Sequence, residues 1–328
     1  MRCLISTCQN PYFNLAAEEY FLKNSTEEIF MLYINEPCIV VGKHQNLLAE
    51  INLRFVNEQN IKLARRISGG GTVYQDPNNL NFSFIRNCKN LDQINFTRFT
   101  LPILESLINI GLKVKFSDRN DLIINNQKVS GNAMHIYKSR VLSHGTLLFN
   151  SNLNQLSGSL RNNSSNYTDK SIKSVKSEVA NISNYLAAPK TIVEFTKDIF
   201  YHVVDHSKLL NPFLSPITSY EALHIEQVSK DKFATWDWIF GYSPKYIFKN
   251  NIKIFDLAIP FELSIERGII LTAHFHAEEK KYPIYSHAFK IITNTKHDFY
   301  AISQILNNDP LINSSVNFNL SEFCYNLF

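Results

Sequence analysis

The sequence predicts an α+β fold in two domains, a large one over residues 1–246 and a smaller one over 247–328. A chain of 328 residues exceeds the size at which one hydrophobic core usually stops growing, so a second domain is expected. Short runs rich in β-branched and aromatic residues alternate with segments of helical spacing, which predicts mixed helices and strands. A second series of strand-like runs follows the turn residues at 244–251, where we place the boundary.

Helices are predicted where apolar residues recur at helical spacing, at 11–24, 101–110, 191–204 and 298–306. The Asn10-Pro11 turn signal opens the first, an amphipathic helix, and Gly111 is a natural C-cap for the second.

Strands are predicted at 29–34, 38–41, 72–74, 81–85, 122–124, 127–129, 145–149, 252–259 and 269–275. Asn125 and Asn126 tolerate a left-handed backbone and predict a β-hairpin between the fifth and sixth of these strands. Pro260 is expected to end the strand at 252–259. The polar stretch 157–177 predicts a surface loop.

Composition indicates an ordinary globular protein, with 45% hydrophobic and 19% charged residues. The N-terminal segment lacks the uninterrupted apolar run of a signal peptide or membrane anchor, so we expect a cytoplasmic protein without membrane association. A net charge of +4, with no concentrated stretch of Lys and Arg, argues against nucleic-acid binding. The five cysteines share no CxxC spacing, which argues against a disulfide framework or structural zinc.

The most informative segment is RRISGGGTVYQD at 65–76, where three of the chain's ten glycines follow two arginines. Consecutive glycines can expose several backbone N–H groups in one concave patch, and guanidinium groups add donors for phosphate or carboxylate. The segment therefore suits an anion such as a nucleotide phosphate. A tight turn beside a surface basic pair is the alternative interpretation. Neither a P-loop nor a Rossmann glycine pattern is present.

Two further segments carry reactive or polar groups. On the return arm of the predicted hairpin, Lys128 could hold a carboxylate nucleophile and an α-phosphate together and stabilise charge on the phosphoryl oxygens, while Asp121 could bind Mg²⁺. An exposed strand lysine with a turn-capping aspartate is the alternative. His144 precedes the apolar strand at 145–149 and could orient an acyl carbonyl or nucleotide, although a lone histidine at a strand start is often structural.

Taken together, RRISGGGTVYQD, QKVSGNA and SHGTLLFNSNL closely resemble the motifs of the lipoate–protein ligase A family. PYFNLAAEE, IVVGKHQN, SVKSEVANI and TWDWIFGYSPKY resemble further segments of that family in the same order, so the resemblance spans nearly the whole chain. It implies a class II biotin/lipoate ligase-type catalytic domain, with mixed sheets flanked by helices, and a small C-terminal α/β accessory domain that moves during the catalytic cycle.

The resemblance also implies a two-step reaction. Lipoate or octanoate and MgATP would give the acyl-AMP and pyrophosphate. A lysine of a lipoyl domain, as in the acyltransferase subunits of 2-oxoacid dehydrogenases, or of the glycine-cleavage H protein would then displace AMP. A monomer is expected for this architecture.

By position in the motifs, Lys128 would be the catalytic residue and would contact both the acyl group and the nucleotide. The segment 135–143 would close over the adenylate, and apolar residues near Leu15, Val40 and Val41 would shape a tunnel for the acyl tail. The residues expected to bind ATP or the acyl-adenylate are Arg66, Ser68, Gly69, Gly70, Gly71, Thr72, Val73, Tyr74, Gln75, Lys128, Ser130, Gly131, Ala133, His144, Gly145 and Thr146.

Two positions depart from the family pattern. Gln75 stands where the family usually has histidine, and it can form hydrogen bonds but cannot titrate. Glu178 stands where an arginine is common, which reverses a charge near the expected adenylate or partner surface. Acyl preference or the acceptor protein is therefore expected to differ from the family norm.

Three other functions stay open at this point. An octanoyl or lipoyl transferase of the same fold would need a nucleophilic cysteine, but no cysteine lies between Cys88 and Cys324. A biotin ligase would share the chemistry but has a different glycine-rich loop. A non-catalytic binding module that retains the pocket is a third possibility, against which Arg66 and Lys128 argue.

Overall fold

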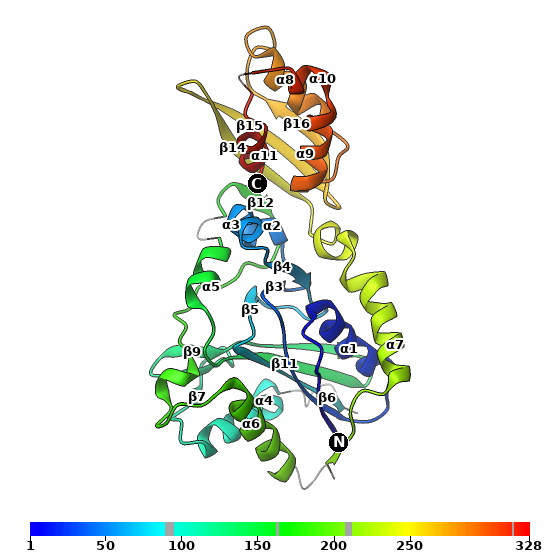
Figure 1. Ribbon diagram of the computed structural model, residues 1–328, viewed down its shortest axis with the longest axis vertical. Coiled ribbons are helices and arrows are strands. Elements are labelled where there is room, and N and C mark those ends of the chain that lie inside the picture. The colour runs from blue at the N-terminus through cyan, green and yellow to red at the C-terminus, as the bar shows by residue number, and fades with distance from the viewer. Residues whose placement is uncertain (89–94, 162–163, 207–211, 317) are drawn as a thin grey trace. The chain divides into compact units, whose positions relative to one another are not determined.

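The computed structural model describes residues 1–88, 95–161, 164–206, 212–316 and 318–328 (Figure 1). The chain divides into two compact units: unit 1 comprises 1–43, 61–157 and 174–235, and unit 2 comprises 44–60, 158–173 and 236–328. We describe each unit by itself. The expected division into domains at 1–246 and 247–328 stays a prediction.

Unit 1 is built on a mixed sheet that has six strands within the described part of the chain, in the order β10–β11–β6–β2–β1–β13. Strands β10, β11, β6 and β2 pair antiparallel, whereas β2 pairs parallel with β1, and β1 with β13. The strands are β1 Arg2–Ile5, β2 Ile29–Ile34, β6 Asn79–Asn87, β10 Asn132–Tyr137, β11 Arg140–Leu148 and β13 Phe213–Leu214.

Two smaller sheets of three strands complete the β structure described in unit 1. One has the order β4–β3–β5, with β3 Cys38–Val41, β4 Lys62–Arg65 and β5 Val73–Gln75. The other has the order β7–β8–β9, with β7 Lys115–Phe116, β8 Leu122–Ile124 and β9 Gln127–Ser130. The chain runs directly from β9 through Gly131 into β10, so the predicted hairpin leads into the edge of the main sheet.

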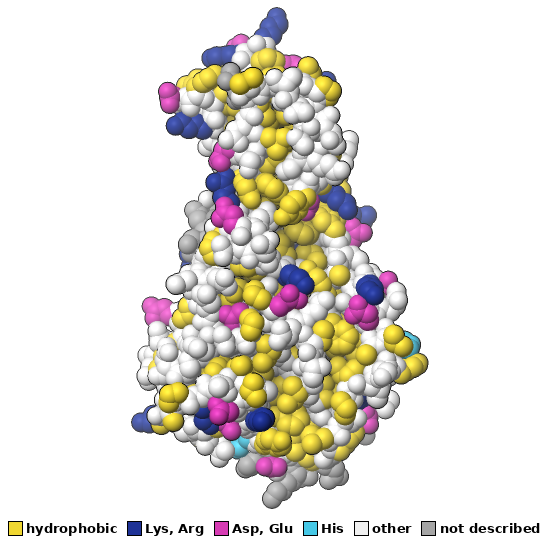
Figure 2. All heavy atoms as spheres, viewed as in Figure 1, with side chains coloured by type: hydrophobic (Ala, Val, Ile, Leu, Met, Phe, Trp, Pro, Cys, Tyr) yellow, Lys and Arg dark blue, Asp and Glu magenta, His cyan; other side chains and the backbone are white. Residues whose placement is uncertain are grey.

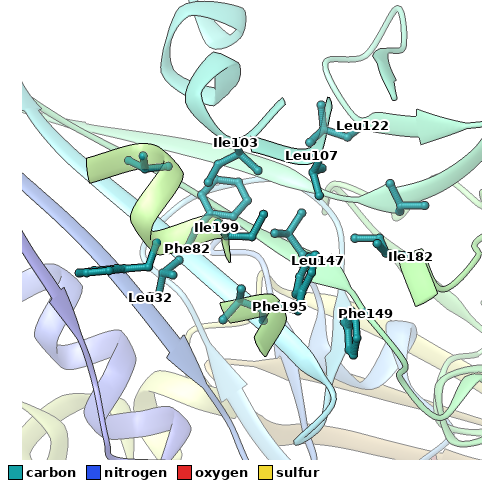
Figure 3. Close-up of a cluster of buried hydrophobic side chains, with 14 of the residues drawn as sticks. Leu32, Phe82, Ile103, Leu107, Leu122, Leu147, Phe149, Ile182, Phe195 and Ile199 are labelled. Carbon is teal, nitrogen blue, oxygen red and sulfur yellow. The ribbon is translucent and has the colours of Figure 1, made fainter. Parts of the chain in front are cut away.

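Helices cover both faces of the main sheet. On one face, α4 (Phe96–Asn109) and α6 (Ile192–His206) pack against strand side chains such as Phe82 and Leu147, with Ile103 of α4 and Phe195 of α6 facing them (Figure 3). Burial of each such side chain contributes roughly 1.5–3 kcal/mol, so this layer stabilises unit 1 substantially. The other face carries α1 (Pro11–Asn24), which contacts β6 and β11. The remaining helical elements of unit 1 are η2 Ile182–Tyr185, α7 Ser219–Val228 and η4 Ser229–Phe233, and α5 Leu153–Ser159 extends from unit 1 into unit 2.

Helix α1 begins as predicted, because the Asn10 side chain accepts a hydrogen bond from Tyr12 N at 2.9 Å and Pro11 occupies the first turn. It is not amphipathic, however. Its buried residues include the polar Asn14, Glu18 and Glu19 as well as apolar side chains. A helix that buries carboxylates must supply them with partners, and those partners lie in the candidate site described below.

Unit 2 contains an antiparallel sheet in the order β12–β14–β15–β16. Its aromatic core includes Phe261, Phe275 and Phe289, whose ring centroids lie 5.0 Å apart in each neighbouring pair. The elements are α2 Leu47–Glu50, α3 Leu53–Glu58, β12 Tyr167–Asp169, η5 Asp237–Gly241, β14 Tyr246–Ile254, β15 Leu257–Glu266, β16 Ile269–Phe275, α8 Pro283–Ile291, α9 Phe299–Asn308, α10 Pro310–Asn313 and α11 Leu320–Asn326.

Several predicted elements are confirmed. Strands 29–34 and 38–41 have the expected bounds, and Asn125 and Asn126 have φ of 49° and 64° in the turn between β8 and β9. Gly111 follows α4 with φ 91° and ends it as expected. The surface loop predicted at 157–177 is confirmed in part, since it includes the end of α5 up to Ser159 and the strand β12, and residues 162–163 lie outside the described residues.

The prediction of one strand at 252–259 is wrong. The chain turns at Phe255, which has φ 55°, so that β14 ends at Ile254 and β15 begins at Leu257. Phenylalanine rarely adopts a left-handed backbone conformation, so the sequence pattern did not predict a turn at this residue. Pro260 lies inside β15, opposite the end of β16, where its carbonyl accepts from His276 N at 3.0 Å. The β15–β16 ladder begins at the next residue, with Phe261 opposite Phe275, so the proline lies at the end of that pairing.

Charged side chains are dispersed over the surface in view. Figure 2 shows Lys and Arg side chains spread over this face and often beside Asp or Glu. None of the described helices is both long enough and apolar enough to cross a lipid bilayer.

Candidate active site

The glycine-rich segment forms the loop between β4 and β5, and the Arg66 side chain organises it from within. The guanidinium donates from Nη1 to Val40 O at 3.0 Å, and from Nη2 to Gly69 O and Gly71 O, both at 2.6 Å. Burial lowers the pKa of Arg66 to about 10, partly offset by the negative charge of Glu18, so the group stays protonated at neutral pH. Arg66 was expected to contact a ligand directly; here its donors hold the loop carbonyls, and a positive charge lies behind the loop.

Because the carbonyls of Gly69 and Gly71 point back to Arg66, the loop amides are left for another acceptor. Within the described residues, the N–H groups of Gly69, Gly70 and Gly71 donate to no protein atom. Gly70 has φ 86°, a conformation that favours glycine. Successive free amides backed by a cation form the kind of concavity that binds phosphate or carboxylate.

A fourth glycine, Gly42 at the end of β3, allows the loop to pack closely. A Cβ added at Gly42 would overlap the carbonyl oxygen of Gly70 and lie 3.2 Å from Arg66 Nη2. The neighbouring Lys43 N donates to Ser68 O at 2.8 Å and so ties the loop to the same strand end. Sequence reasoning did not assign Gly42, because a single glycine after a strand gives no signal of which loop it will meet.

A chain of buried hydrogen bonds joins the loop to helix α1. Arg66 Nε donates to Ser68 Oγ at 3.0 Å, Ser68 Oγ lies 2.6 Å from His144 Nε2, and His144 Nδ1 lies 2.8 Å from Glu18 Oε2. A carboxylate accepts only, so His144 Nδ1 donates to Glu18, and with a neutral imidazole Nε2 accepts from the Ser68 hydroxyl. Every donor and acceptor along this chain is then satisfied.

Glu18 anchors the chain from a fully buried position. Its carboxylate also accepts from Tyr33 OH at 3.0 Å and from Ser83 Oγ. Burial and the charge of Glu18 raise the pKa of Tyr33 well above its usual value, so the phenol remains a donor. His144 thus lies beside the glycine-rich loop, and its role toward a ligand stays a prediction. Its carboxylate partner was missed because two adjacent glutamates in a helix do not reveal which of them is buried.

Lys128 lies on β9 and points to Gly131. Its Nζ lies 3.1 Å from Asp121 Oδ1, and a Cβ added at Gly131 would lie 3.2 Å from the same Nζ. The Lys128 backbone donates to Glu178 O at 2.8 Å and accepts from Ala180 N at 3.0 Å, which holds β9 between two neighbours. Glu178 takes part through its carbonyl, while its side chain is exposed.

Asp121 therefore faces an ammonium group. In the described part of the chain no group of three or more His, Cys, Asp or Glu side chains could hold a metal ion. Asp121 is a single carboxylate that is already paired with Lys128. Such a group suits Mg²⁺ that is bound mainly by the phosphates of ATP better than Mg²⁺ that is bound only by protein side chains. Its role toward Mg²⁺ stays a prediction.

The predicted segments converge through close backbone contacts. Thr146 N donates to Gly131 O at 3.1 Å, and a Cβ added at Gly145 would lie 2.7 Å from that same Gly131 oxygen. Ala133, on β10, comes close to the glycine-rich loop, because a Cβ added at Gly70 would lie 3.8 Å from its methyl group. The loop, the lysine segment and the histidine segment thus form one site in unit 1.

Other predicted residues lie around this centre, where they contact protein atoms, and their roles toward a ligand stay predictions. Thr72 N donates to Ser174 Oγ at 2.9 Å, Tyr74 OH donates to Gln155 Oε1 at 2.5 Å, and Ser130 Oγ donates to Asn132 Oδ1 at 3.3 Å. Val73 is half-buried on β5. Leu15, Val40 and Val41 are buried, and their part in an acyl tunnel stays a prediction.

Gln75 is turned into a buried amide network. Its Oε1 accepts from Asn35 Nδ2 at 2.7 Å, Asn35 Oδ1 accepts from Asn14 Nδ2 at 2.7 Å, and Asn14 Oδ1 accepts from Ser6 Oγ at 2.7 Å. The network ties β5 to the end of β2 and to α1. The expected role of Gln75 near the acyl carboxyl stays a prediction, and the contacts described here are structural.

A charged cluster lies beside the site on α1, β10 and η4. Glu19 accepts from Lys232 Nζ at 2.7 and 2.9 Å and also pairs with Lys23. Burial by itself would raise the pKa of Glu19, but the two ammonium groups outweigh this effect, so the pKa lies below its usual value. Burial and the nearby Lys43 lower the pKa of His135. The segment 135–143, expected to close over the adenylate, forms a β-hairpin of β10 and β11 around Lys138.

Comparison with known proteins identifies the family. Residues 10–203 match the lipoyl protein ligase A/B catalytic domain. The chain belongs to the lipoyl protein ligase A/B family. It is 40% identical over 263 residues to lipoate–protein ligase 1 of Staphylococcus aureus, covering 80% of this chain and 79% of that one, and 36% identical over 263 residues to a lipoate–protein ligase of Bacillus subtilis, covering 80% of each.

Solved structures of this family share the fold. P. falciparum LipL1 in complex with lipoate has a TM-score of 0.63 at 26% identity and covers 94% of this chain and 95% of that one. A lipoate–protein ligase A bound with ATP has a TM-score of 0.62 at 23% identity, covering 74% and 98%. The predicted α+β fold of biotin/lipoate ligase type is confirmed, and the protein is an enzyme of the lipoate–protein ligase type.

Proposed function

We propose that this enzyme is an ATP-dependent lipoate–protein ligase that works through an acyl-adenylate. In the first step a carboxylate oxygen of lipoate or octanoate attacks the α-phosphorus of ATP, and the bond to pyrophosphate breaks. In the second, the neutral amine of an acceptor lysine attacks the acyl carbonyl carbon, and AMP leaves as the amide forms. The acceptor would be a lipoyl domain or the glycine-cleavage H protein.

The observation that carries this proposal is that the segment of Lys128 meets a loop of free amides, where Ala133 lies against Gly70. The amides of Gly69, Gly70 and Gly71, backed by Arg66, suit phosphoryl oxygens. Lys128 approaches from β9 with a charge that suits both the acyl carboxylate and the α-phosphate. The acyl carboxylate and the phosphate are both negatively charged and repel each other. A cation between them allows both to bind at the distance that the reaction requires.

The remaining site residues would position these groups. The loop would be held in place by the hydrogen-bond chain from Ser68 to His144, at 2.6 Å, and from His144 to Glu18, at 2.8 Å. Gly131 leaves room for the Lys128 ammonium group, and Gly145 lets β11 approach Gly131. Magnesium would enter as the counter-ion of ATP.

The substrates are supported by the relatives. One related structure carries lipoate and another carries ATP. An archaeal bipartite lipoate–protein ligase, 23% identical with a TM-score of 0.61 and covering 74% of this chain and 96% of that one, is described together with its E2 lipoyl domain. These ligands and partners belong to those proteins, and we extend them to this one. The expected cytoplasmic location and monomeric state stay predictions.

A transferase that carries the acyl group on a cysteine is the rival mechanism. Burial raises the pKa of Cys3 and of Cys324 to about 11 and raises that of Cys38 further. A buried thiol with a raised pKa is a poor nucleophile at neutral pH. Cys8 and Cys88 are half-buried, so replacing both with serine tests the rival directly.

The experiment is lipoate-dependent exchange of labelled pyrophosphate into ATP, measured without acceptor protein. We expect exchange by the wild-type enzyme and by the Cys8→Ser/Cys88→Ser variant. Lys128→Ala should lose at least about 100-fold in exchange rate, as expected when a charged group that stabilises the transition state is removed. Lys253→Ala, which removes a largely exposed lysine of β14, is the matched control and should exchange normally.

The outcomes separate the alternatives. Exchange at the normal rate by folded Lys128→Ala would remove Lys128 from the chemistry. No exchange by a wild-type enzyme that still moves an acyl group between proteins, and loses this activity when Cys8 and Cys88 are replaced, would establish the transferase. A folded protein with neither activity would support a binding module.

A further inference from the structure

Strand β10 forms one edge of the main sheet of unit 1, immediately after the reactive segment. In the described residues its ladder partner is β11 alone. The hydrogen bond from Thr146 N to Gly131 O makes these residues a bonded pair, and in an antiparallel ladder bonded pairs recur at every second residue. The backbone groups of Ala133, His135 and Tyr137 therefore face β11, whereas those of Asn132, Met134 and Ile136 face outward.

The outward edge of β10 is open and lacks the usual protection. No backbone hydrogen bond in the described part of the chain involves the outward groups of Asn132, Met134 or Ile136. None of the six residues of β10 is buried, and Ile136 is 46% exposed. Soluble proteins normally protect such an edge with proline, lysine or a bulge, because an open edge pairs readily with another strand. The sequence NAMHIY contains no proline and no lysine.

The outward edge of β10 begins beside the candidate active site. Lys128 and Gly131 precede β10 directly, and Ala133 lies against Gly70 of the amide loop. A strand paired with β10 would lie about 4.8 Å from it, which is within the reach of a lysine side chain. A polypeptide added here would therefore carry its neighbouring turn past the position where the acyl-adenylate is expected.

The charges beside β10 favour an acidic partner. Lys138 forms the exposed turn of the β10–β11 hairpin. Lys23 of α1, which also pairs with Glu19, lies 5.6 Å from the ring of Tyr137 on β10, and 41% of its side chain is exposed. These cations lie at the end of β10 that is far from Lys128. They would attract carboxylates of a partner and set the direction of approach.

We propose that the outward edge of β10 is the docking edge for the acceptor protein, which adds an extended strand of an acidic domain and so presents its lysine to the site. This inference rests on the proposed ligase function. Main-chain hydrogen bonds from the outward groups of residues 132, 134 and 136 would provide the pairing, and side chains at the ends of the strand would provide the selectivity.

The test removes one outward donor without disturbing the ladder to β11. Met134→Pro eliminates the N–H at the centre of the outward edge, and proline is tolerated on edge strands. Met134→Ala is the matched control, since it removes the side chain but keeps the N–H. Both variants are assayed for lipoate-dependent pyrophosphate exchange without acceptor, and for kcat/KM of transfer to a purified acidic lipoyl domain.

We expect both variants to exchange pyrophosphate within about twofold of wild type. Transfer by Met134→Pro should fall about fivefold, as the loss of one main-chain hydrogen bond predicts, while Met134→Ala transfers nearly normally. Equal transfer by the two variants, with exchange intact, would overturn the docking edge. Failure of exchange in the wild-type enzyme would instead overturn the proposed function, so the two failures are distinguishable.

Hydrogen exchange of the wild-type enzyme keeps the proposal testable if Met134→Pro does not fold. The amides of residues 132, 134 and 136 should become protected when the lipoyl domain is added at saturating concentration. Protection that is unchanged by the domain would overturn the proposal. Protection that instead rises with enzyme concentration alone would assign the edge to a second copy of this chain and would overturn it as well.

Discussion

Gly42 offers the sharpest test of how the site is assembled, because it touches the amide loop without belonging to it. In Gly42→Ala, the added Cβ would overlap Gly70 O, below the 3.0 Å that real Cβ atoms keep from other atoms, and would lie 3.1 Å from Gly70 C. The alanine cannot move, since β3 is buried and paired on both sides with β4 and β5. The Gly70 peptide must therefore retreat.

The size of the effect follows from that displacement. Relieving the overlap requires a shift of about 1 Å, and a misplacement of that size typically costs about 100-fold in rate. The lost transition-state stabilisation is then about 2.7 kcal/mol. We expect kcat/KM for ATP in pyrophosphate exchange to fall about 100-fold in Gly42→Ala, with a single cooperative thermal transition retained.

Gly69→Ala is the control for the loop itself. No atom lies within 4 Å of a Cβ added at Gly69, so this variant should unfold at the wild-type temperature whatever its effect on nucleotide binding. Undiminished exchange by well-folded Gly42→Ala would refute the reasoning, because it would mean that the position of the Gly70 peptide does not matter to the reaction.

Three further changes follow from buried or paired groups. Glu18→Gln keeps the side-chain volume but places an NH₂ group against the donors of His144, Tyr33 and Ser83. It should lower the free energy of unfolding by about 1–3 kcal/mol in urea titrations. An unchanged unfolding midpoint would contradict the buried hydrogen-bond chain through His144. Hydrogen bonding to Arg2 lowers the pKa of Glu221 to about 2, so its stabilisation is present above the unfolded value of about 4.5 and is lost as pH falls toward 2. Glu221→Gln should therefore unfold at a lower temperature than wild type at pH 7, with the difference shrinking below pH 4.5; a difference that is constant with pH would rule out the carboxylate as its source. Gln75→Ala leaves Asn35 Nδ2 buried without its acceptor and should destabilise by about 1–3 kcal/mol while pyrophosphate exchange persists, and loss of exchange without loss of stability would instead place Gln75 in the chemistry.

Local signals account for the elements that were predicted well. The helix at 11–24 has a cap and a proline, and the hairpin at 122–129 has two asparagines that accept positive φ, so neighbouring residues contain the information. The turn at Phe255 shows the limit. Nothing in that residue favours a left-handed backbone, and only the pairing of β14 with β15 across it imposes the conformation.

The amino-acid sequence by itself determined the family and singled out three segments, because the glycines after Arg65-Arg66, the QKVSGNA segment around Lys128 and the SHGT segment around His144 are specified residue by residue. The expected strand start at Gly145 was too late, since His144 lies within β11. The tertiary structure alone decided where those side chains point. Arg66 turns back into its loop, Gln75 turns into a buried amide network, and Glu18 lies beneath His144. These directions depend on partners that are distant in sequence, since a buried polar group is oriented by whichever acceptor or donor the fold brings to it.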